Sequence, residues 1–387
     1  MSCVHKVAYA LLLLQCVVMP SVQGETPVRI GVSLGLTGSY GNMSQIQSHA
    51  YKLWEKHINA RGGILGRKVE MVIRDDNSNV ETAKKIYQNF VQTDKVDFVL
   101  GPYSGPITEA VVPIIEQYGY PMLASSATSD ELWKHGYTHL STIISPASRY
   151  TIGFLTILGQ TKLKQMAVVY ADDKFSTGLA EGTKKWAAEY GIQITSYQKI
   201  AKGSVDLTGP AKIAHDSGAQ ALVMAGHYEE SVNMRKALKQ IGWMPNAYYA
   251  SVGPGTNNYQ TALGNDAEAT FSSSDWEAHE GLKLPGSKEF LREYIKDYGE
   301  KPSYHGARAY AAAQVLEQAI KKAGNFDRKT VRDALFQLDT QSLIGRYVVD
   351  RTGAQMKGFP MITQWQKGKR EIVWPDELRT AEPIFNK

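Results

Sequence analysis

The stretch Phe98–Leu132, FVLGPYSGPITEAVVPIIEQYGYPMLASSATSDEL, contains two strand–turn–helix units in succession. The apolar run Phe98–Leu100 predicts a short strand, and the polar turn after it opens a predicted helix over about residues 107–118. The run Pro121–Ala124 repeats the pattern, and the small hydroxyl residues and Asp130-Glu131 after it are typical of a second helix N-terminus. Two neighbouring helix N-termini carry unpaired N–H groups and partial positive charge, so this sheet edge is predicted to bind an anionic group.

The residues of these two turns have two interpretations. Serine and threonine before a helix commonly act as structural caps, whereas N–H and hydroxyl groups at adjacent strand ends also form ligand sites. The candidate binding residues in the two turns are Tyr103, Ser104, Gly105, Ser125, Ser126 and Thr128.

The first residues of the chain have the three-part form of a secretory signal peptide. Met1–Gly24 begins with His5 and Lys6, continues with the apolar run Val7–Leu14 and ends in small residues. The apolar run is too short to span a bilayer. We therefore expect cleavage near Gly24 and export to the periplasm.

Both cysteines of the sequence, Cys3 and Cys16, lie inside this predicted signal peptide. The mature chain from about Glu25 would then contain no thiol and no disulfide. A lipid anchor at Cys16 is the competing interpretation, because this residue follows an apolar run, but Gln15 before it is larger than the small residue usual there.

Composition limits the class of protein further. Beyond Gly24 no run is long and apolar enough for a transmembrane helix, so none is expected in the mature chain. The rest of the 387-residue chain has room for two medium-sized domains. The net charge of +5 is small, and Lys and Arg are scattered among Asp and Glu, so no nucleic-acid partner is expected.

Strands and helices alternate in both halves of the sequence. The β-branched run Pro27–Ser33 leads into a Gly- and hydroxyl-rich turn that contains Tyr40 and then into a predicted helix. A change of composition at residues 145–148 precedes a second series with strands at Gln165–Tyr170 and Ala221–Ala225. This alternation predicts an α/β protein with two doubly wound parallel-sheet lobes.

The order of the segments predicts that the chain passes between the lobes three times. We expect an N-terminal lobe of residues 25–145 plus 272–352 and a C-terminal lobe of residues 146–271 plus 353–387. Three hinge strands beside a cleft between two lobes are typical of a protein that opens and closes.

The sequence contains no recognisable catalytic arrangement. No G-x-S-x-G motif and no phosphate-binding glycine loop occur, and the predicted mature chain has no cysteine nucleophile. Asp75-Asp76 has no His or Cys nearby and is interpreted as a helix cap rather than a metal site. We therefore predict no catalytic residue, no metal and no cofactor.

Aromatic side chains recur at the ends of predicted strands. Tyr40, Tyr103, Phe175 and Tyr228 each follow a strand, where side chains line a crevice rather than the interior of a sheet. His227 also ends a strand and is expected to face the cleft.

The mature chain resembles the leucine/isoleucine/valine-binding family of type I periplasmic solute-binding proteins of ABC transporters. The segments that carry the resemblance are RIGVSLGLTGSYG (29–41), INARGGILGRKVEMVIRDDNSN (58–79), VLGPYSGPITEAVVPIIEQYGYPMLASSATSDEL (99–132), VVYADDKFSTGLAEG (168–182) and DRTGAQMKGF (350–359). The resemblance covers essentially all of the mature chain and implies the two-lobed fold of that family.

The resemblance also assigns roles to residues of the two turns. In the family, backbone N–H groups and hydroxyls of these turns hold a ligand carboxylate in the first lobe. Thr128 matches the family's carboxylate-binding threonine, and Ser126 matches a residue that binds through its backbone. Phe175 and Tyr228 match aromatic residues of the second lobe that close over the ligand.

Two departures from the family pattern concern the ligand. Gly105 stands where the amino-acid binders have a serine. This replacement keeps the backbone N–H donor and removes a hydroxyl. In the amino-acid binders of the family, an acid of the second lobe pairs with the ligand ammonium, and its position falls near Val252 in this sequence. Ser251, next to Val252, is a further candidate binding residue. Because a buried ammonium without a carboxylate is costly, either Glu229 or Glu230 takes this role or the ligand is not a simple α-amino acid.

Together these features predict a monomeric, exported substrate-binding protein. It would capture a small carboxylate-bearing solute, such as a branched-chain amino acid, an amide or another organic acid, and deliver it to ABC permease and ATPase subunits. One alternative is a ligand-sensing receptor protein with the same fold. The other is a secreted α/β enzyme that uses His227 with Glu229 or Glu230 as an acid–base pair.

Overall fold

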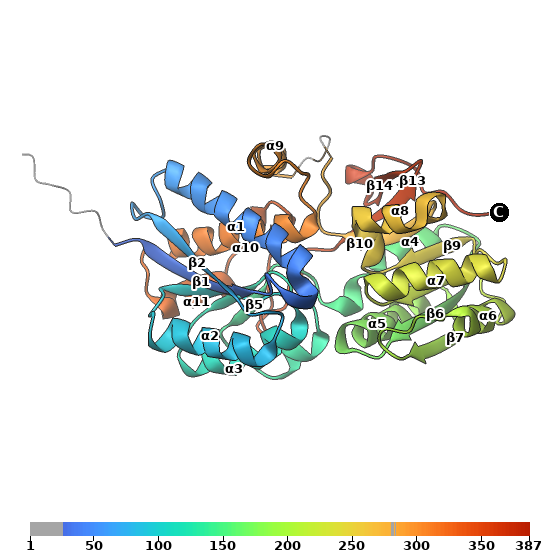
Figure 1. Cartoon of the computed structure of the whole chain (residues 1–387), viewed down its shortest axis with the longest axis horizontal. Coiled ribbons are helices and arrows are strands. Elements are labelled where there is room, and N and C mark those ends of the chain that lie inside the picture. The colour runs from blue at the N-terminus through green and yellow to red at the C-terminus, as the bar shows by residue number, and fades with distance from the viewer. Residues whose placement is uncertain (1–25, 280–281, 283) are drawn as a thin grey trace, which may run out of the picture.

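The computed structural model describes residues 26–279, 282 and 284–387. The predicted signal peptide, with Cys3 and Cys16, lies outside the described residues. Figure 1 shows two lobes beside each other, each with a central sheet and helices packed on it.

The first lobe is built on a five-stranded sheet with the order β2-β1-β3-β4-β5, in which every pair of neighbours is parallel. Its strands are β1 (Val28–Leu34), β2 (Val69–Asp75), β3 (Phe98–Leu100), β4 (Met122–Ala124) and β5 (Leu140–Thr142). Its helices are α1 (Gly41–Ala60), α2 (Val80–Gln92), α3 (Gly105–Gln117), α9 (Ser287–Tyr298), α10 (Tyr304–Ala323) and α11 (Arg328–Phe336). A two-stranded ribbon of β11 (Thr340–Ser342) and β12 (Gly345–Tyr347) follows α11.

The second lobe is built on a seven-stranded sheet with the order β14-β13-β10-β9-β8-β6-β7. Its strands are β6 (Gln165–Ala171), β7 (Gln193–Ile200), β8 (Ala221–Ala225), β9 (Ala247–Ala250), β10 (Thr270–Ser274), β13 (Met361–Gln366) and β14 (Lys369–Trp374). Its helices are α4 (Ile152–Gly159), α5 (Lys174–Glu189), α6 (Thr208–Asp216), α7 (Tyr228–Gln240) and α8 (Asn257–Leu263). The five strands from β6 to β10 are parallel, and the hairpin β13–β14 joins antiparallel at one edge. The fold is thus the predicted α/β fold with two parallel-sheet lobes.

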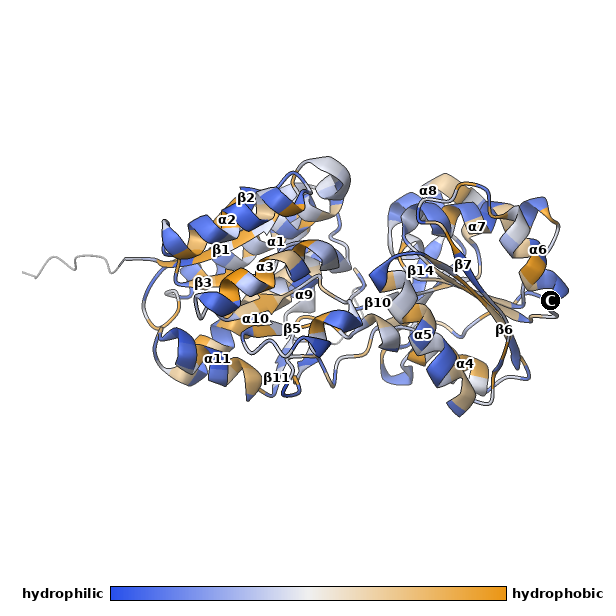
Figure 2. Ribbon diagram, turned by 90° about the horizontal axis from the view of Figure 1, so that it is seen from below, coloured by the Kyte–Doolittle hydropathy of each residue, from blue (hydrophilic) through white to orange (hydrophobic). Residues whose placement is uncertain are grey.

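Apolar strands and helix faces account for the core of each lobe. In the first lobe, buried residues of β1 and α1 pack against α10, which is buried along most of its length. In the second lobe, the sheet is covered on one face by α4 and α5 and on the other by α6 and α7. Figure 2 shows hydrophobic residues on strands such as β1 and β3 and hydrophilic residues on outward helix surfaces.

Sheet membership locates the passages of the chain between the lobes. The first passage lies between β5 and β6, the second follows β10, and the third lies between β12 and β13. The predicted boundary at Ser272 falls inside β10, which continues to Ser274 in the second sheet. At the third passage, the carbonyl of Gly353 accepts a hydrogen bond of 3.0 Å from the N–H of Thr142, so Gly353 still lies against the first sheet.

The second helix predicted in the stretch 98–132 is wrong. Residues Asp130–Lys134 form only a short 3₁₀ helix, η2, and its N-cap Ser129 makes no side-chain hydrogen bond. Asp130 instead accepts hydrogen bonds from the N–H and hydroxyl of Ser148 in a second 3₁₀ helix, η3 (Ala147–Arg149). Because so short a helix has little dipole, the first turn keeps a helix N-terminus and the second does not.

Two helices of the second lobe, which the sequence pattern predicts to begin at Leu179 and Ser231, begin earlier. Helix α5 starts at Lys174, because Asp173 caps it by accepting from the N–H of Ser176, and α7 starts at Tyr228. Phe175 and Tyr228, predicted to lie in turns after strands, therefore lie in the first turns of these helices.

Candidate functional site

The two turns singled out in the sequence lie against each other in the structure. Strands β3 and β4 pair in parallel, with Leu100 opposite Leu123, so both end at the same edge of the sheet. A Cβ atom placed on Gly105 would lie 3.7 Å from the Cβ of Ser129, which is ordinary van der Waals contact between the two turns.

The backbone donors of these turns are without partners. Within the described chain, the N–H groups of Gly105, Ser126 and Thr128 donate no hydrogen bond. Gly105 is the first residue of the 13-residue helix α3, where unpaired N–H groups and the helix dipole favour an anion. The arrangement supplies several hydrogen-bond donors to a group between the turns.

The serine hydroxyls of the two turns form hydrogen bonds that stabilise the turns themselves. The side-chain amide of Gln47 donates to Ser126 at 2.7 Å and to Ser125 at 3.4 Å, and the hydroxyl of Tyr51 lies 3.2 Å from that of Ser125. Ser104 caps α3 by accepting from the N–H of Ile107 at 3.4 Å. Ser104 also has φ of 87° and ψ of 147°, a strained conformation for a residue other than glycine that is typical of functional turns.

Thr128 differs from its neighbours because its hydroxyl caps nothing. Ser129 occupies the N-cap position of η2, and no side-chain hydrogen bond of Thr128 occurs in the part of the chain that is described. The side chain is buried, with 9% of the residue exposed. The interpretation of Thr128 as a structural cap is therefore wrong, and its hydroxyl is free to donate beside the backbone donors.

A line of ring contacts starts in the first lobe next to these turns. The rings of Tyr40 and Tyr103 are 5.2 Å apart between centroids, and those of Tyr103 and His305 are 5.6 Å apart. His305 in turn lies 4.2 Å from the ring of Tyr304, its neighbour at the start of α10. Two of the aromatic residues predicted from the sequence are thus in direct contact.

A buried ion pair continues the line towards the second lobe. The guanidinium of Arg308 lies 4.5 Å from the centroid of the Tyr304 ring and forms an ion pair with Asp275, which follows β10. Arg308 also donates to the hydroxyl of Tyr150 at 3.2 Å. One guanidinium therefore joins α10, the second passage between the lobes and the segment that enters α4.

The line ends on two side chains of the second lobe. The ring centroid of Phe175 lies 5.8 Å from that of Tyr150 and 5.5 Å from that of His227. We call this set the aromatic series, and its members are Tyr40, Tyr103, His305, Tyr304, Arg308, Tyr150, Phe175 and His227. Four of these residues were predicted from the sequence, and the series brings them together.

Electrostatics fix the protonation of His305 in the series and of Asp173 beside it. His227 lies 3.3 Å from a carboxylate oxygen of Asp173; burial opposes ionisation of this carboxyl, but hydrogen bonds from His227 and Ser176 lower its pKa to about 2. His305 is 4% exposed, and burial followed by the positive charge of Arg308 lowers its pKa well below its ordinary value. His305 is therefore neutral, and neither ring nitrogen has a partner among the described residues.

The remaining predicted residues are placed elsewhere. The hydroxyl of Tyr228 donates to the carbonyl of Asn258 at 3.1 Å, and its ring packs on a separate apolar cluster of the second lobe. Ser251 exchanges hydrogen bonds of 2.9 and 2.6 Å with the N–H and carbonyl of Gly226, which ties together the ends of β8 and β9.

The two glutamates suggested as partners for a ligand ammonium are also unsuited to that role. Glu230 is buried and accepts from the N–H groups of Gly203 and His227, so its carboxylate supports the start of α7. Glu229 is exposed to solvent. The sequence suggested that the His227 side chain pairs with Glu229 or Glu230. In the structure this side chain pairs with Asp173 instead.

Sequence reasoning missed Tyr150, Asp275, His305 and Arg308. His305 and Arg308 lie one helical turn apart near the start of α10, and that spacing of polar residues in an alanine-rich helix was the signal available. Nothing in the sequence indicates that Asp275 reaches them.

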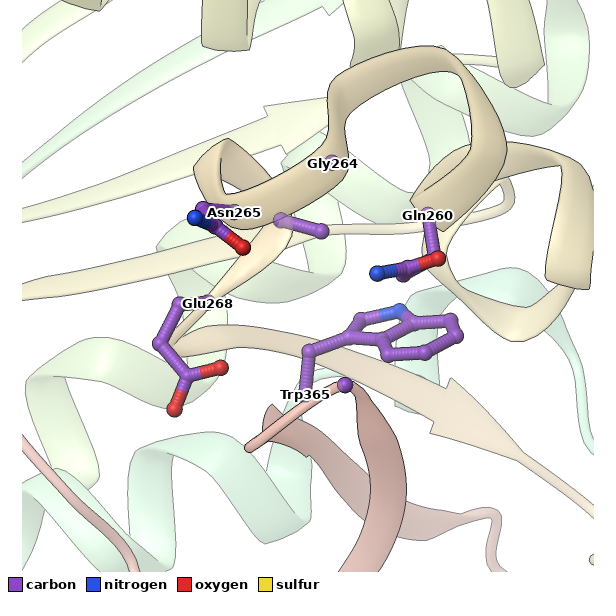
Figure 3. Close-up of a pocket in the computed structure, with 7 residues that line it drawn as sticks. Gln260, Gly264, Asn265, Glu268 and Trp365 are labelled. Carbon is purple, nitrogen blue, oxygen red and sulfur yellow. The ribbon is translucent and has the colours of Figure 1, made fainter.

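Two other hollows of the described surface contain none of the predicted site residues. Figure 3 shows the first, a cavity of about 30 Å³ in the second lobe where Gln260 lies above the indole ring of Trp365. This volume admits about one water molecule. The second, of about 400 Å³, lies on the first lobe and is lined by Asp97, Tyr118, Gly119, Phe326, Asp327, Arg328 and Lys329.

The described residues contain neither a membrane-spanning helix nor a cluster of metal-binding side chains. None of their helices combines the length and the apolar character needed to cross a membrane. In the same residues, no group of three or more His, Cys, Asp or Glu side chains is arranged to hold a metal ion.

Known proteins resemble this chain along nearly its whole length. The leucine-, isoleucine-, valine-, threonine- and alanine-binding protein of Pseudomonas aeruginosa is 25% identical over 342 residues, which cover 88% of this chain and 90% of that protein. A branched-chain amino acid transporter substrate binding protein of Streptococcus pneumoniae, solved with isoleucine, has a TM-score of 0.77 at 22% identity and covers 93% of this chain and 100% of its own. A solute binding protein of Rhodopseudomonas palustris, solved with 3,4-dihydroxybenzoic acid, has a TM-score of 0.75 at 18% identity, with coverage of 89% and 95%.

These structural similarities concern the fold, which agrees with the two lobes described above. The family model described as periplasmic binding protein matches residues 27–370, which include the first sheet, the second sheet as far as the start of β14 and the candidate site. The chain belongs to the periplasmic binding protein family.

Proposed function

We propose that this protein is an exported substrate-binding protein of an ABC transporter that captures a small carboxylate-bearing solute between its lobes. It then delivers the solute to permease and ATPase subunits in the membrane. The observation that carries this proposal is a group of unpartnered hydrogen-bond donors at one sheet edge of the described chain. These donors are the Thr128 hydroxyl and the N–H groups of Gly105, Ser126 and Thr128. Neutral donors of this kind hold a carboxylate through charge-assisted hydrogen bonds.

The relatives support a carboxylate as the common feature of the ligand. The Streptococcus pneumoniae protein was solved with isoleucine and the Rhodopseudomonas palustris protein with 3,4-dihydroxybenzoic acid. An amino acid and an aromatic acid share a carboxylate and little else. The first-lobe turns of this chain suit that shared group.

The aromatic series is the proposed surface for the rest of the solute. It includes Tyr103 of the first lobe and Phe175 of the second, so a molecule held by the turns touches rings from both sides. Closure of the lobes about the three passages of the chain would bury the solute. In this scheme the protein is a monomer that binds its solute unchanged and needs no cofactor.

The test is a pair of measurements on the purified protein. Native mass spectrometry, followed by a thermal-shift screen of amino acids, amides and organic acids, identifies the solute; a ligand at about a hundred times its Kd should stabilise the protein by about 2.7 kcal/mol. Small-angle X-ray scattering should then show a smaller radius of gyration with that solute. An unchanged radius with every carboxylate-bearing compound would contradict capture by closure.

The enzyme alternative is tested with the same sample. A bound solute recovered unchanged after long incubation supports binding alone. Turnover above the buffer control that disappears in His227→Ala would favour the enzyme.

A further inference from the structure

A ligand ammonium buried between the lobes would need a carboxylate partner, because an unpaired buried charge is costly. The acids that adjoin the aromatic series already have partners. Asp275 is paired with Arg308, and Asp173 binds His227 and caps α5. Neither carboxylate can turn to a ligand without leaving a cation or a helix end unpaired.

Other acids of the described chain are committed in the same way. Glu277 is buried and pairs with Arg370 at 3.0 Å. Glu230 holds two backbone N–H groups, and Asp130 holds the N–H and hydroxyl of Ser148. Glu229 remains, but it is exposed, and water screens an ion pair at such a position.

The turn after β9 offers hydrocarbon in place of an acid. Val252 is half-buried there, beside Ser251, whose hydroxyl is fully used by Gly226. This is the position where the resemblance places the acid of the amino-acid binders. Among the described residues, the second-lobe side of the site therefore offers no free buried carboxylate to a cation.

His305 is the polar group of the aromatic series that has no partner. It is more than nine-tenths buried, both ring nitrogens are unpartnered among the described residues, and its ring lies between those of Tyr103 and Tyr304. Burial and the charge of Arg308 lower the pKa of His305, and the same positive charge disfavours a ligand ammonium beside it. A neutral imidazole has one donor and one acceptor, which match a hydroxyl or keto oxygen.

We propose that the solute is a carboxylic acid without an ammonium group, with an apolar body along the aromatic series and a hydroxyl or keto oxygen bound by His305. This inference rests on the proposed function and names the chemical class of its solute. The carboxylate lies at the first-lobe turns, and because no buried acid among the described residues of the second lobe is free to pair with an ammonium, the amino acid of the same carbon skeleton should bind more weakly.

Matched pairs of compounds test this selectivity directly. Isothermal titration calorimetry compares leucine with 4-methyl-2-oxopentanoate and 2-hydroxy-4-methylpentanoate, and phenylalanine with phenylpyruvate and phenyllactate. In at least one series the oxo or hydroxy acid should bind more than about ten-fold tighter than the amino acid, a difference of about 1.4 kcal/mol. Amino acids that bind as tightly or more tightly would overturn the inference and leave the proposed function standing.

The variant His305→Phe tests the role of the ring nitrogens. Phenylalanine keeps a planar ring between Tyr103 and Tyr304 and removes both nitrogens. We expect about a ten-fold loss for the favoured oxo or hydroxy acid and little change for the same acid without that oxygen, such as 4-methylpentanoate or 3-phenylpropanoate. Equal losses for both compounds would contradict a bond to His305, and thermal unfolding without ligand checks that the variant is folded.

A complete lack of binding in both series would also overturn the inference. The scattering measurement then judges the proposed function separately. A smaller radius of gyration with any other carboxylate would retain capture of an acid, whereas no change with any compound would remove it.

Discussion

The two lobes contribute different chemistry to the candidate site. The first lobe offers backbone N–H groups of Gly105, Ser126 and Thr128, whose positions are fixed by the ends of β3 and β4. The second lobe offers the side chains of Phe175 and His227 from the first turns of two helices. If the proposed function holds, the sheet edge of the first lobe supplies the directional hydrogen bonds to the solute, and the second lobe adds mainly ring contacts when the lobes close.

This difference suggests an order of events. A carboxylate held by preformed donors in the open first lobe loses little freedom when the second lobe arrives. The rings of the second lobe then remove apolar surface from water without specifying one orientation. The joint between the lobes and each half of the site can be altered separately, which allows the comparison to be tested.

The largest effect is expected at the joint between the lobes. Arg308→Met would leave Asp275 buried without its cation, and loss of one partner of a buried pair costs about 3–5 kcal/mol. Chemical denaturation should show this loss in the free energy of unfolding. The control Arg346→Met breaks an exposed pair with Asp339 and should leave the free energy of unfolding nearly unchanged. Equal effects in the two variants would mean that Arg308 does not join the lobes as described.

The next largest effect concerns the polar half of the site. Thr128→Val keeps the shape of the side chain and removes the hydroxyl. A hydrogen bond to a charged group contributes about 1.5–3 kcal/mol. Its loss should weaken carboxylate binding by about ten- to a hundred-fold. Stability without ligand should hardly change, because Thr128 caps no helix. Calorimetric titration and thermal unfolding measure the two quantities, with the exposed Thr93→Val as control. Unchanged affinity would place the carboxylate elsewhere.

The sequence predicted the parts of the fold that depend on local patterns. Strands Phe98–Leu100 and Ala221–Ala225 were predicted with their observed bounds, since apolar runs are local signals. Strand β10 was not recognised as part of the second sheet. Its residues Thr270–Ser274 are mostly polar, and they are buried because partners such as Tyr249 and Tyr150 from distant segments bind Ser273.

The site was predictable to a similar extent. Thr128 and Tyr103 follow strands of the first sheet closely enough that topology alone brings them to one edge, and Phe175 follows β6 of the second sheet in the same way. The central members of the aromatic series lie inside α10 and in the segments between the lobes. Arg308 is buried because Asp275, 33 residues earlier, comes back to it, and a contact of that kind has no signature in a single sequence.

A smaller effect concerns the pH response of the second lobe. The pKa of Asp173 in the folded protein is about 2, below its ordinary value of 3.8. A carboxyl group whose pKa is lower in the folded protein than in the unfolded chain stabilises the fold. This stabilisation is fully present at pH values above the ordinary pKa, and it is lost as the pH falls through the pKa of the folded protein. The contribution is roughly 2 kcal/mol, present above about pH 4 and lost towards pH 2.

Asp173→Asn should remove this part of the pH dependence, because asparagine keeps the acceptor that caps α5 and does not ionise. Denaturation curves of the variant and the natural protein measured from about pH 5 to pH 3 provide the comparison. His227→Gln should have a similar effect, since His227 is the side chain that holds the carboxylate of Asp173. Parallel curves for all three proteins would show that the pair does not contribute to acid sensitivity.

The smallest effect is expected where the lobes touch at the surface. The ammonium of Lys174 on α5 lies 2.6 Å from Glu109 on α3, so this ion pair joins the two lobes. About half of the Lys174 side chain is exposed, and an exposed pair contributes about 0–1 kcal/mol, which salt reduces. Lys174→Met should therefore weaken solute binding by less than about five-fold at low salt and hardly at all at high salt.

The control for this variant is Lys199→Met, which breaks an equally exposed pair with Asp172 inside the second lobe. Because that pair does not connect the lobes, closure should not alter it, and affinity should stay the same at every salt concentration. Titration calorimetry at two ionic strengths separates the two variants. If Lys174→Met matches the control at low salt, the pair forms no better in the closed protein than in the open one. The energy of closure would then come from the solute and the rings of the aromatic series alone.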